Sequence, residues 1–198
     1  KKTKKEILEF VNSYLYVDKY AANSIYEYFR EQFEYATIPS DKRVIIEHFK
    51  NENGNHLIFH SLFGRRVNDC LSRIIAYVAG KTNHRDVEIG MSDNGFFIRT
   101  DKGVNVEQIL KILKKSNFEE IAKLSIEQTE VLKRRFRHCA ARALMILRMY
   151  KGHQKRVGRQ QVSSMILMSA VKRISQNFPI LKEARREVLE DLMDGKNA

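Results

Sequence analysis

The sequence predicts an α+β fold with a mostly antiparallel sheet built from two β-hairpins, packed with N-terminal helices and a C-terminal helical bundle. Asn53-Gly54 and Asn94-Gly95 each lie between short runs of β-branched and aromatic residues, which is the pattern of a hairpin. Each hairpin segment is followed by a stretch of helical periodicity, and further helical stretches lie at both ends of the chain. Strands and helices segregated in this way are typical of the α+β class.

The first 36 residues are predicted to form two helices. Asp18 is placed to cap the second helix, which we expect to run through Tyr35. Pro39 prevents further helix, so residues 36–41 are predicted to form a turn. The first helix carries an apolar stripe made of Ile7, Leu8, Phe10, Val11 and Leu15.

The middle of the chain is predicted to alternate hairpins and helices. Residues 51–55 form the loop of the first hairpin, and Asp93-Asn94-Gly95 suits a tight turn that needs positive φ in the second. The predicted elements are strands Arg43–Lys50 and His56–Phe63, a helix from Arg65 to about Val78, strands Val87–Met91 and Phe96–Thr100, and a helix over Val106–Lys115.

The C-terminal part is predicted to hold three helices, over Ile126–Tyr150, Gln160–Gln176 and Ile180–Met193, with Pro179 at the start of the last. We expect an N-terminal helical segment (1–40), an α+β hairpin and helix region (41–122) and a basic C-terminal helical region (123–198), which together form one compact accessory domain. Because the chain begins with lysine rather than methionine and ends abruptly in a polar run, we expect it to be a fragment of a larger protein.

The positive charge of the chain is concentrated in one segment. The formal net charge is +12, and the 52 positions from Val131 to Lys182 contain no aspartate or glutamate. Of the 36 lysines and arginines, 13 lie in this segment, and the 24 acidic residues nearly balance the others. Such a field attracts a polyanion, because each neutralised phosphate releases condensed counterions. The alternative is a basic face that is merely solvated.

Other classes of protein find little support in the sequence. No apolar run approaches the roughly 20 residues that cross a bilayer, so we expect no membrane partner. Cys70 and Cys139 lie in amphipathic helical patterns and are predicted to be buried, reduced thiols, which favours a cytoplasmic location.

Several short motifs resemble catalytic or metal sites but lack the residues that the chemistry needs. Gly80-Lys81-Thr82 has Ile75 where a phosphate-binding loop requires glycine, and we expect a helix to end at Gly80 instead. His84-Arg85-Asp86 resembles a kinase catalytic loop without its glycine-rich loop. His138-Cys139, like the strand residues His48, His56 and His60, lacks further ligands at metal-binding spacing. We therefore predict no catalytic residue, metal site or cofactor in this chain.

The basic helix predicted over Ile126–Tyr150 is the main candidate binding surface. At about 100° per residue, its apolar residues share one arc and its arginines lie opposite. Arginine favours bidentate contacts with phosphate. The competing interpretation is that these arginines pair with glutamates elsewhere, such as Glu119, Glu120, Glu187 and Glu190. The candidates on this helix are Arg134, Arg135, Arg137, Arg142 and Arg148.

Two further groups of candidates lie at predicted helix starts, where free N–H groups favour phosphate. Ordinary capping and solubility are the alternative explanation. The first group comprises Lys151, Lys155 and Arg156 in the loop from Lys151 to Gly158, with Arg159, Gln160 and Gln161 at the start of the next helix, and the weaker second group is Arg65 and Arg66.

Four blocks of the sequence resemble the Lhr (large helicase-related) family of ATP-dependent helicases. They are Phe59-His60-Ser61-Leu62-Phe63-Gly64-Arg65-Arg66-Val67-Asn68-Asp69, Phe136-Arg137-His138-Cys139-Ala140, Val157-Gly158-Arg159-Gln160-Gln161 and Glu187-Val188-Leu189-Glu190-Asp191-Leu192-Met193-Asp194. They look like the DEAD/H-associated region that lies C-terminal to the RecA-like motor and the winged helix. The resemblance spans roughly residues 5 to 198 and implies a role in DNA repair or recombination. The Walker and DExH motifs are absent, so ATP and Mg²⁺ are expected in motor domains outside this chain.

The leading hypothesis is therefore an accessory domain that grips single-stranded DNA during ATP-driven unwinding, within a parent chain that also holds the motor and winged-helix domains. One alternative is a structural brace whose basic helix docks on the motor or on a protein partner. A second alternative is an RNA-binding module, since the same charge suits either nucleic acid.

Overall fold

A computed structural model of the protein describes residues 2–83, 86–101, 103–115, 117–147, 149–154 and 156–198. The chain folds as two compact units, the first ending at Ile45 and the second running from Ile46 to Ala198. The domain boundary predicted after residue 40 lies near the junction of these units. The boundary predicted after residue 122 falls inside a helix, α5 (Phe118–Ile126).

The first unit is a pair of helices, α1 (Lys4–Leu15) and α2 (Lys19–Tyr35), as predicted. Asp18 caps α2 by accepting a hydrogen bond of 2.7 Å from a backbone N–H of its first turn. Among the described residues of this unit, only Val11 and Ala22 are buried. The pair therefore has almost no core of its own.

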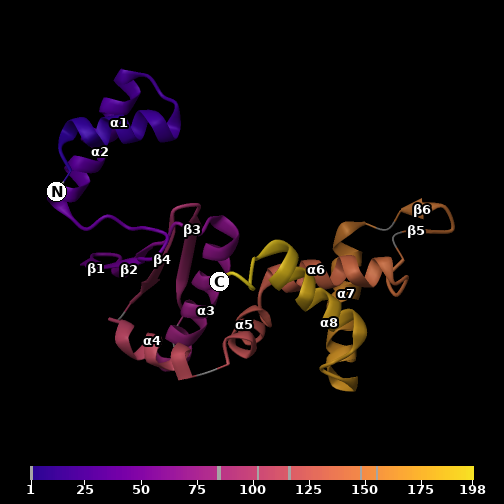
Figure 1. Ribbon diagram of the computed structural model, residues 1–198. Helices are drawn as coiled ribbons and strands as arrows, with labels where there is room; N and C mark the ends of the chain where they lie inside the picture. The colour runs from indigo at the N-terminus through magenta and orange to yellow at the C-terminus, as the bar shows by residue number, and fades with distance from the viewer. Residues whose placement is uncertain (1, 84–85, 102, 116, 148, 155) are drawn as a thin grey trace. The chain divides into compact units, whose positions relative to one another are not determined.

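The second unit opens with a four-stranded sheet in the order β1-β2-β4-β3, which confirms the predicted α+β class (Figure 1). Both predicted hairpins are present, and the antiparallel pair β2–β4 joins them. Its register places Leu57 opposite Ile98 and Phe59 opposite Phe96. The strands are β1 (Ile45–Asn51), β2 (Gly54–His60), β3 (Glu88–Ser92) and β4 (Gly95–Thr100).

Gly95, in the second hairpin, was predicted to supply a positive φ, but the structure needs glycine there for another reason. Gly95 does not have a positive φ. A Cβ atom at this position would instead collide with the backbone carbonyl of Phe59 on the neighbouring strand. Glycine is needed here because two backbones approach closely.

One face of the sheet packs on the long helix α3 (Arg65–Asn83) (Figure 1). We expected this helix to end at Gly80, but it continues to Asn83, because Val78 and Ala79 are buried and packing outweighs the low helix propensity of glycine. The predicted helix α4 (Val106–Lys115) and α5 follow, and both contact α3.

Asn68 of α3 joins three parts of this unit. Its side chain is fully buried, and its Oδ1 accepts a hydrogen bond of 2.8 Å from the Ser61 hydroxyl. Its Nδ2 donates to the backbone carbonyls of Ser61, Ser92 and Asp93 at 3.0 to 3.1 Å. One amide thus links the end of β2, the first turns of α3 and the turn between β3 and β4.

The predicted bounds of the basic helix, Ile126–Tyr150, are wrong. Residue 126 is the last of α5, Thr129 caps a separate helix, α6 (Glu130–Arg142), and Leu144 adopts a left-handed conformation with φ of 57°. The chain turns there because Ile146 is buried and its backbone N–H bonds back to the Ala140 carbonyl at 3.2 Å. Tertiary packing therefore overrides a run of good helix formers.

A small hairpin spans the predicted end of the basic helix and the start of the predicted loop, Lys151 to Gly158. Its strands are β5 (Met149–Tyr150) and β6 (His153–Gln154). Lys151 and Gly152 between these strands both have positive φ, as a two-residue hairpin turn requires. The chain then continues into α7 (Val157–Ile174), α8 (Pro179–Arg186) and a π-helical turn, η1 (Glu187–Leu192). Helix α7 begins three residues earlier than predicted, so Gly158 and Arg159 lie in its first turn.

We expect Asn68→Ala to lower the free energy of unfolding by about 3 kcal/mol, because it leaves the buried hydroxyl and carbonyl of Ser61, and two partly buried carbonyls, without their partner. Urea denaturation would measure this change. Asn53→Ala, in an exposed turn, serves as the control and is expected to cost less than about 0.5 kcal/mol. Equal effects of the two substitutions would contradict this role of Asn68.

Candidate nucleic-acid interface

The cations of α6 form two groups on different sides of the helix. At about 100° per residue, Lys133, Arg134 and Arg137 share one side, whereas Arg135 and Arg142 lie roughly a quarter of a turn or more away. The first group faces the start of α7, and the second faces η1. The helix therefore does not present one uniform arginine face.

Arg135 and Arg142 both bind Glu187, whose side chain is only 6% exposed. The Arg135 Nη1 atom lies 3.3 Å from Glu187 Oε2, and Arg142 Nη2 binds Oε1 of the same carboxylate. Glu187 is one of the glutamates named in the competing interpretation. These two candidates thus carry a structural ion pair between α6 and η1.

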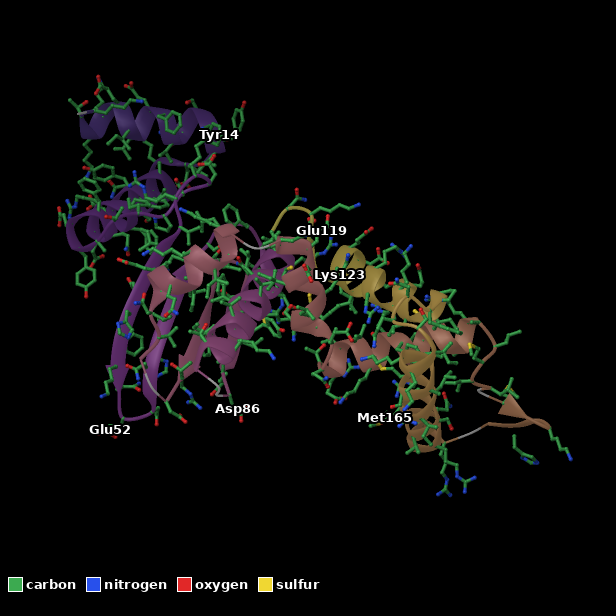
Figure 2. The ribbon with its side chains drawn as sticks, turned by 90° about the horizontal axis from the view of Figure 1, so that it is seen from below. Tyr14, Glu52, Asp86, Glu119, Lys123 and Met165 are labelled. Carbon is green, nitrogen blue, oxygen red and sulfur yellow. The ribbon has the colours of Figure 1, made fainter. Side chains whose placement is uncertain are left out.

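Lys133, Arg134 and Arg137 line a cavity of about 320 Å³ between α6 and α7. Among the described residues, neither Arg134 nor Arg137 has an ion-pair or hydrogen-bond partner. Lys133 binds Glu130 at 2.7 Å, and this glutamate also lines the cavity. The remaining lining residues come from α7 and are Val157, Gln161, Ser164 and Met165, the last of which is labelled in Figure 2. We call this cavity the α6–α7 pocket.

The wall contributed by α7 is the start of the helix. Arg156 occupies the N-cap position without a side-chain capping bond, and the first turn holds no acidic residue. Its backbone N–H groups and the positive end of the helix dipole are thus available to an anion. Arg156 and Arg159 are exposed at this end and make no ion pair within the described part of the chain.

The remaining residues predicted to bind nucleic acid lie in different surroundings. Lys151 and Gln160 take part in interactions within the chain, and Arg148 and Lys155 lie outside the described residues. Arg65 is exposed as the first residue of α3. Arg66 donates to the backbone carbonyls of Glu190 and Asp191 at 2.8 and 3.1 Å, so its guanidinium is engaged at the end of η1.

Lys133, Ser164 and Met165 line the pocket but are not among the candidates predicted from the sequence. Lys133 could have been found from its spacing, because residues four apart on a helix are neighbours and Arg137 lies four residues later. The contribution of α7 depends on how the two helices pack, which a local pattern does not specify.

Most of the chain matches one known sequence family. The family described as "DEAD/H associated" matches residues 38–198. The chain belongs to this family. Its proposed resemblance to Lhr helicases is also confirmed, since relatives of the DEAD/H-associated chain carry that name.

Relatives of this DEAD/H-associated chain are much longer proteins. It is 50% identical to the ATP-dependent helicase Lhr-Core of Methanothermobacter thermautotrophicus over 198 residues, which are all of this chain and 23% of that protein. The Lhr-Core of Saccharolobus solfataricus is 41% identical over 97% of this chain and 23% of its own length. The chain therefore spans about a quarter of these relatives.

A solved structure resembles this DEAD/H-associated chain in fold. It is the structure of Mycobacterium smegmatis helicase Lhr bound to ssDNA and AMP-PNP, with a TM-score of 0.77 and 25% sequence identity. The similarity covers 98% of this chain and 25% of that one.

A second glutamate holds the C-terminal helices of the DEAD/H-associated chain together. Glu127, next to α5, binds Lys172 of α7 at 2.8 Å and Arg185 of α8 at 2.5 Å. Burial acts to raise the pKa of the Glu127 carboxyl, but hydrogen bonds from Arg185 and Lys172 outweigh it, and the pKa lies below its usual value. This carboxylate thus stays ionised between two helices.

The two cysteines of the DEAD/H-associated chain, Cys70 and Cys139, are buried and free, as predicted. Burial raises the pKa of Cys70 to about 11, and it also raises the pKa of Cys139. Both thiols are therefore protonated at neutral pH, which makes them poor nucleophiles.

The weak catalytic and metal motifs gain no support from their surroundings. Gly80-Lys81-Thr82 lies within α3, and His84-Arg85 lies outside the described residues. The His60 Nε2 atom lies 3.3 Å from a carboxylate oxygen of Glu47, and the His56 ring stacks on Phe49. Within the described ranges, no three His, Cys, Asp or Glu side chains gather as metal ligands. No described helix has both the length and the apolar character that crossing a bilayer requires.

We expect Glu127→Gln to lower the free energy of unfolding by on the order of 2 kcal/mol at pH 7, because it leaves two cations with a neutral partner. The pKa of Glu127 is lower in the folded state, so its stabilisation is present above the unfolded pKa and is lost as pH falls through the folded one. The two proteins should therefore converge in stability in acid. Urea denaturation from pH 7 to about 3 tests this, and a difference that persists at the acid end would contradict it.

Proposed function

We propose that residues 46–198 are a nucleic-acid-binding accessory region of an ATP-dependent helicase that holds the backbone of a single DNA strand. The observation that carries this proposal is the α6–α7 pocket, where Arg134 and Arg137 have no partner among the residues that the structure describes and lie beside a helix start without a side-chain cap. Two guanidinium groups next to the start of a helix suit a phosphodiester group.

The chemistry of the pocket supports binding without sequence preference. The one carboxylate among its described lining residues, that of Glu130, is paired with Lys133, which leaves Arg134 and Arg137 to bind phosphate. Phosphate contacts position a strand without reading its bases. Exposed Arg156 and Arg159 extend the positive surface from the pocket along the start of α7. A strand held in this way can slide past the protein, as translocation requires.

The comparisons favour single-stranded DNA as the ligand. The similar solved structure is of a helicase Lhr bound to ssDNA, and the curated relatives are named ATP-dependent helicases. In this proposal the motor that uses ATP and Mg²⁺, together with a winged-helix domain, lies in the remainder of a longer polypeptide. A role in DNA repair and a cytoplasmic location belong to the same proposal.

Reversing the charge of all four arginines of α6 would not separate a loss of binding from a loss of stability, because Arg135 and Arg142 hold the buried Glu187. We expect Arg134→Gln with Arg137→Gln to weaken binding to a labelled oligonucleotide of about 20 deoxythymidines by about tenfold in low salt. The slope of log affinity against log salt should fall in magnitude by about 1.4, the value for two phosphate contacts on a single strand. Fluorescence anisotropy measures both quantities.

Arg173→Gln with Lys182→Gln is the matched control. Both residues are exposed cations of the same acid-free segment, and the variant loses the same net charge without touching the pocket. An equal loss of affinity in the two variants would show that the pocket is not the site. Failure of the unchanged protein to bind any nucleic acid would favour a structural brace, and preference for a matched RNA strand would favour an RNA-binding module.

A further inference from the structure

The apolar stripe of α2 continues beyond the helix that covers it. The Lys4 Nζ atom lies 2.8 Å from Glu27 Oε1 and 4.9 Å from the centre of the Tyr26 ring, so the first turn of α1 lies level with these residues of α2. Helix α2 runs on to Tyr35. Its last two turns therefore have no partner helix within the first unit.

Two phenylalanines occupy this uncovered part of the stripe. Phe29 and Phe33 follow Ala22 and Ile25 at helical spacing on one side of α2. Ala22 is fully buried, whereas the exposed fractions of Phe29 and Phe33 are 48% and 71%. The stripe is thus a packing surface that is filled over one half of the helix only.

The charges around the stripe favour a protein partner over a nucleic acid. Glu27, Glu31 and Glu34 lie in this half of α2 with Arg30, whose guanidinium binds Glu27 at 2.9 Å and Glu34 at 3.6 Å. The last ten residues of α2 therefore carry more negative than positive charge, which repels phosphates. An apolar polypeptide surface suits two neighbouring phenylalanines.

The similar proteins indicate which polypeptide could cover Phe29 and Phe33. The DEAD/H-associated match begins at residue 38 and leaves out both α1 and α2, whereas the relative that is 50% identical matches all 198 residues and is more than four times as long. We infer that Phe29 and Phe33 dock on an apolar surface in the remainder of the longer helicase polypeptide, so that α1 and α2 complete the core of a neighbouring domain. This inference is independent of the nucleic-acid site.

Photo-crosslinking in the full-length polypeptide that carries these 198 residues tests the assignment. We expect p-benzoylphenylalanine in place of Phe33 to crosslink, on irradiation, to a peptide of the same molecule outside residues 1–198, identified by mass spectrometry. The same group in place of Tyr35, which is 90% exposed and lies off the stripe, should give no such product. A crosslink to residues 46–198, to a second copy of the protein, or to nothing would overturn the inference.

Hydrogen exchange provides an independent measurement on the same polypeptide. Phe29→Ser with Phe33→Ser should speed exchange of the α2 amides by about tenfold or more, because these amides lose the protection that docking provides. Tyr20→Ser with Tyr35→Ser removes two rings that lie outside the stripe and are more exposed than Phe29 and Phe33, and it should leave exchange unchanged. Unaltered exchange in α3 shows that the second unit is folded. Equal effects of the two pairs would overturn the docking.

Discussion

The burial of one carboxylate, that of Glu187, constrains the arrangement of the C-terminal helices. A carboxylate removed from water costs several kcal/mol unless cations and hydrogen bonds compensate it. Arg135 and Arg142 provide this compensation from a single helix, and they can do so only in one rotation of α6 about its axis. The same rotation turns Arg134 and Arg137 toward the start of α7. A structural ion pair on one side of α6 thus determines which guanidinium groups line the pocket on the other side.

The acid-free segment is partly neutralised by residues that flank it. Glu127 lies just before the segment and binds Lys172, and Glu187 lies just after it and binds two arginines. These pairs tie α5, α6, α7, α8 and η1 together, so a fraction of the positive charge has a structural purpose. Four arginines without a partner among the described residues lie around the pocket and the first turn of α7, which is why we place the phosphate site there: Arg134, Arg137, Arg156 and Arg159.

The two units differ in how they are stabilised. Residues 46–198 enclose a continuous core that runs from the sheet through α3 to α6 and α8. The first unit buries only Val11 and Ala22 among its described residues and exposes many aromatic rings, including Tyr14 at the far end of α1 (Figure 2). A pair of helices with so little core depends on contacts from elsewhere for its stability. The docking that we propose for Phe29 and Phe33 would provide such contacts.

The sequence by itself determined the features that depend on neighbouring residues: the cap at Asp18, the two hairpins with their Asn-Gly turns, and the excess of cations between Val131 and Lys182. Local side chains and backbone angles are sufficient for the cap and for the positions of the hairpins, but glycine is needed at position 95 because the Phe59 carbonyl of the neighbouring strand lies close. The end of α6 at Arg142 was decided only by the tertiary structure, because the residues that follow are good helix formers and the burial of Ile146 turns the chain. The division of the arginines was also decided there, since Glu187 is 45 residues from Arg142 and 52 from Arg135. A periodic pattern shows which residues share a side of a helix, but only folding brings a distant carboxylate to one side and another helix to the other.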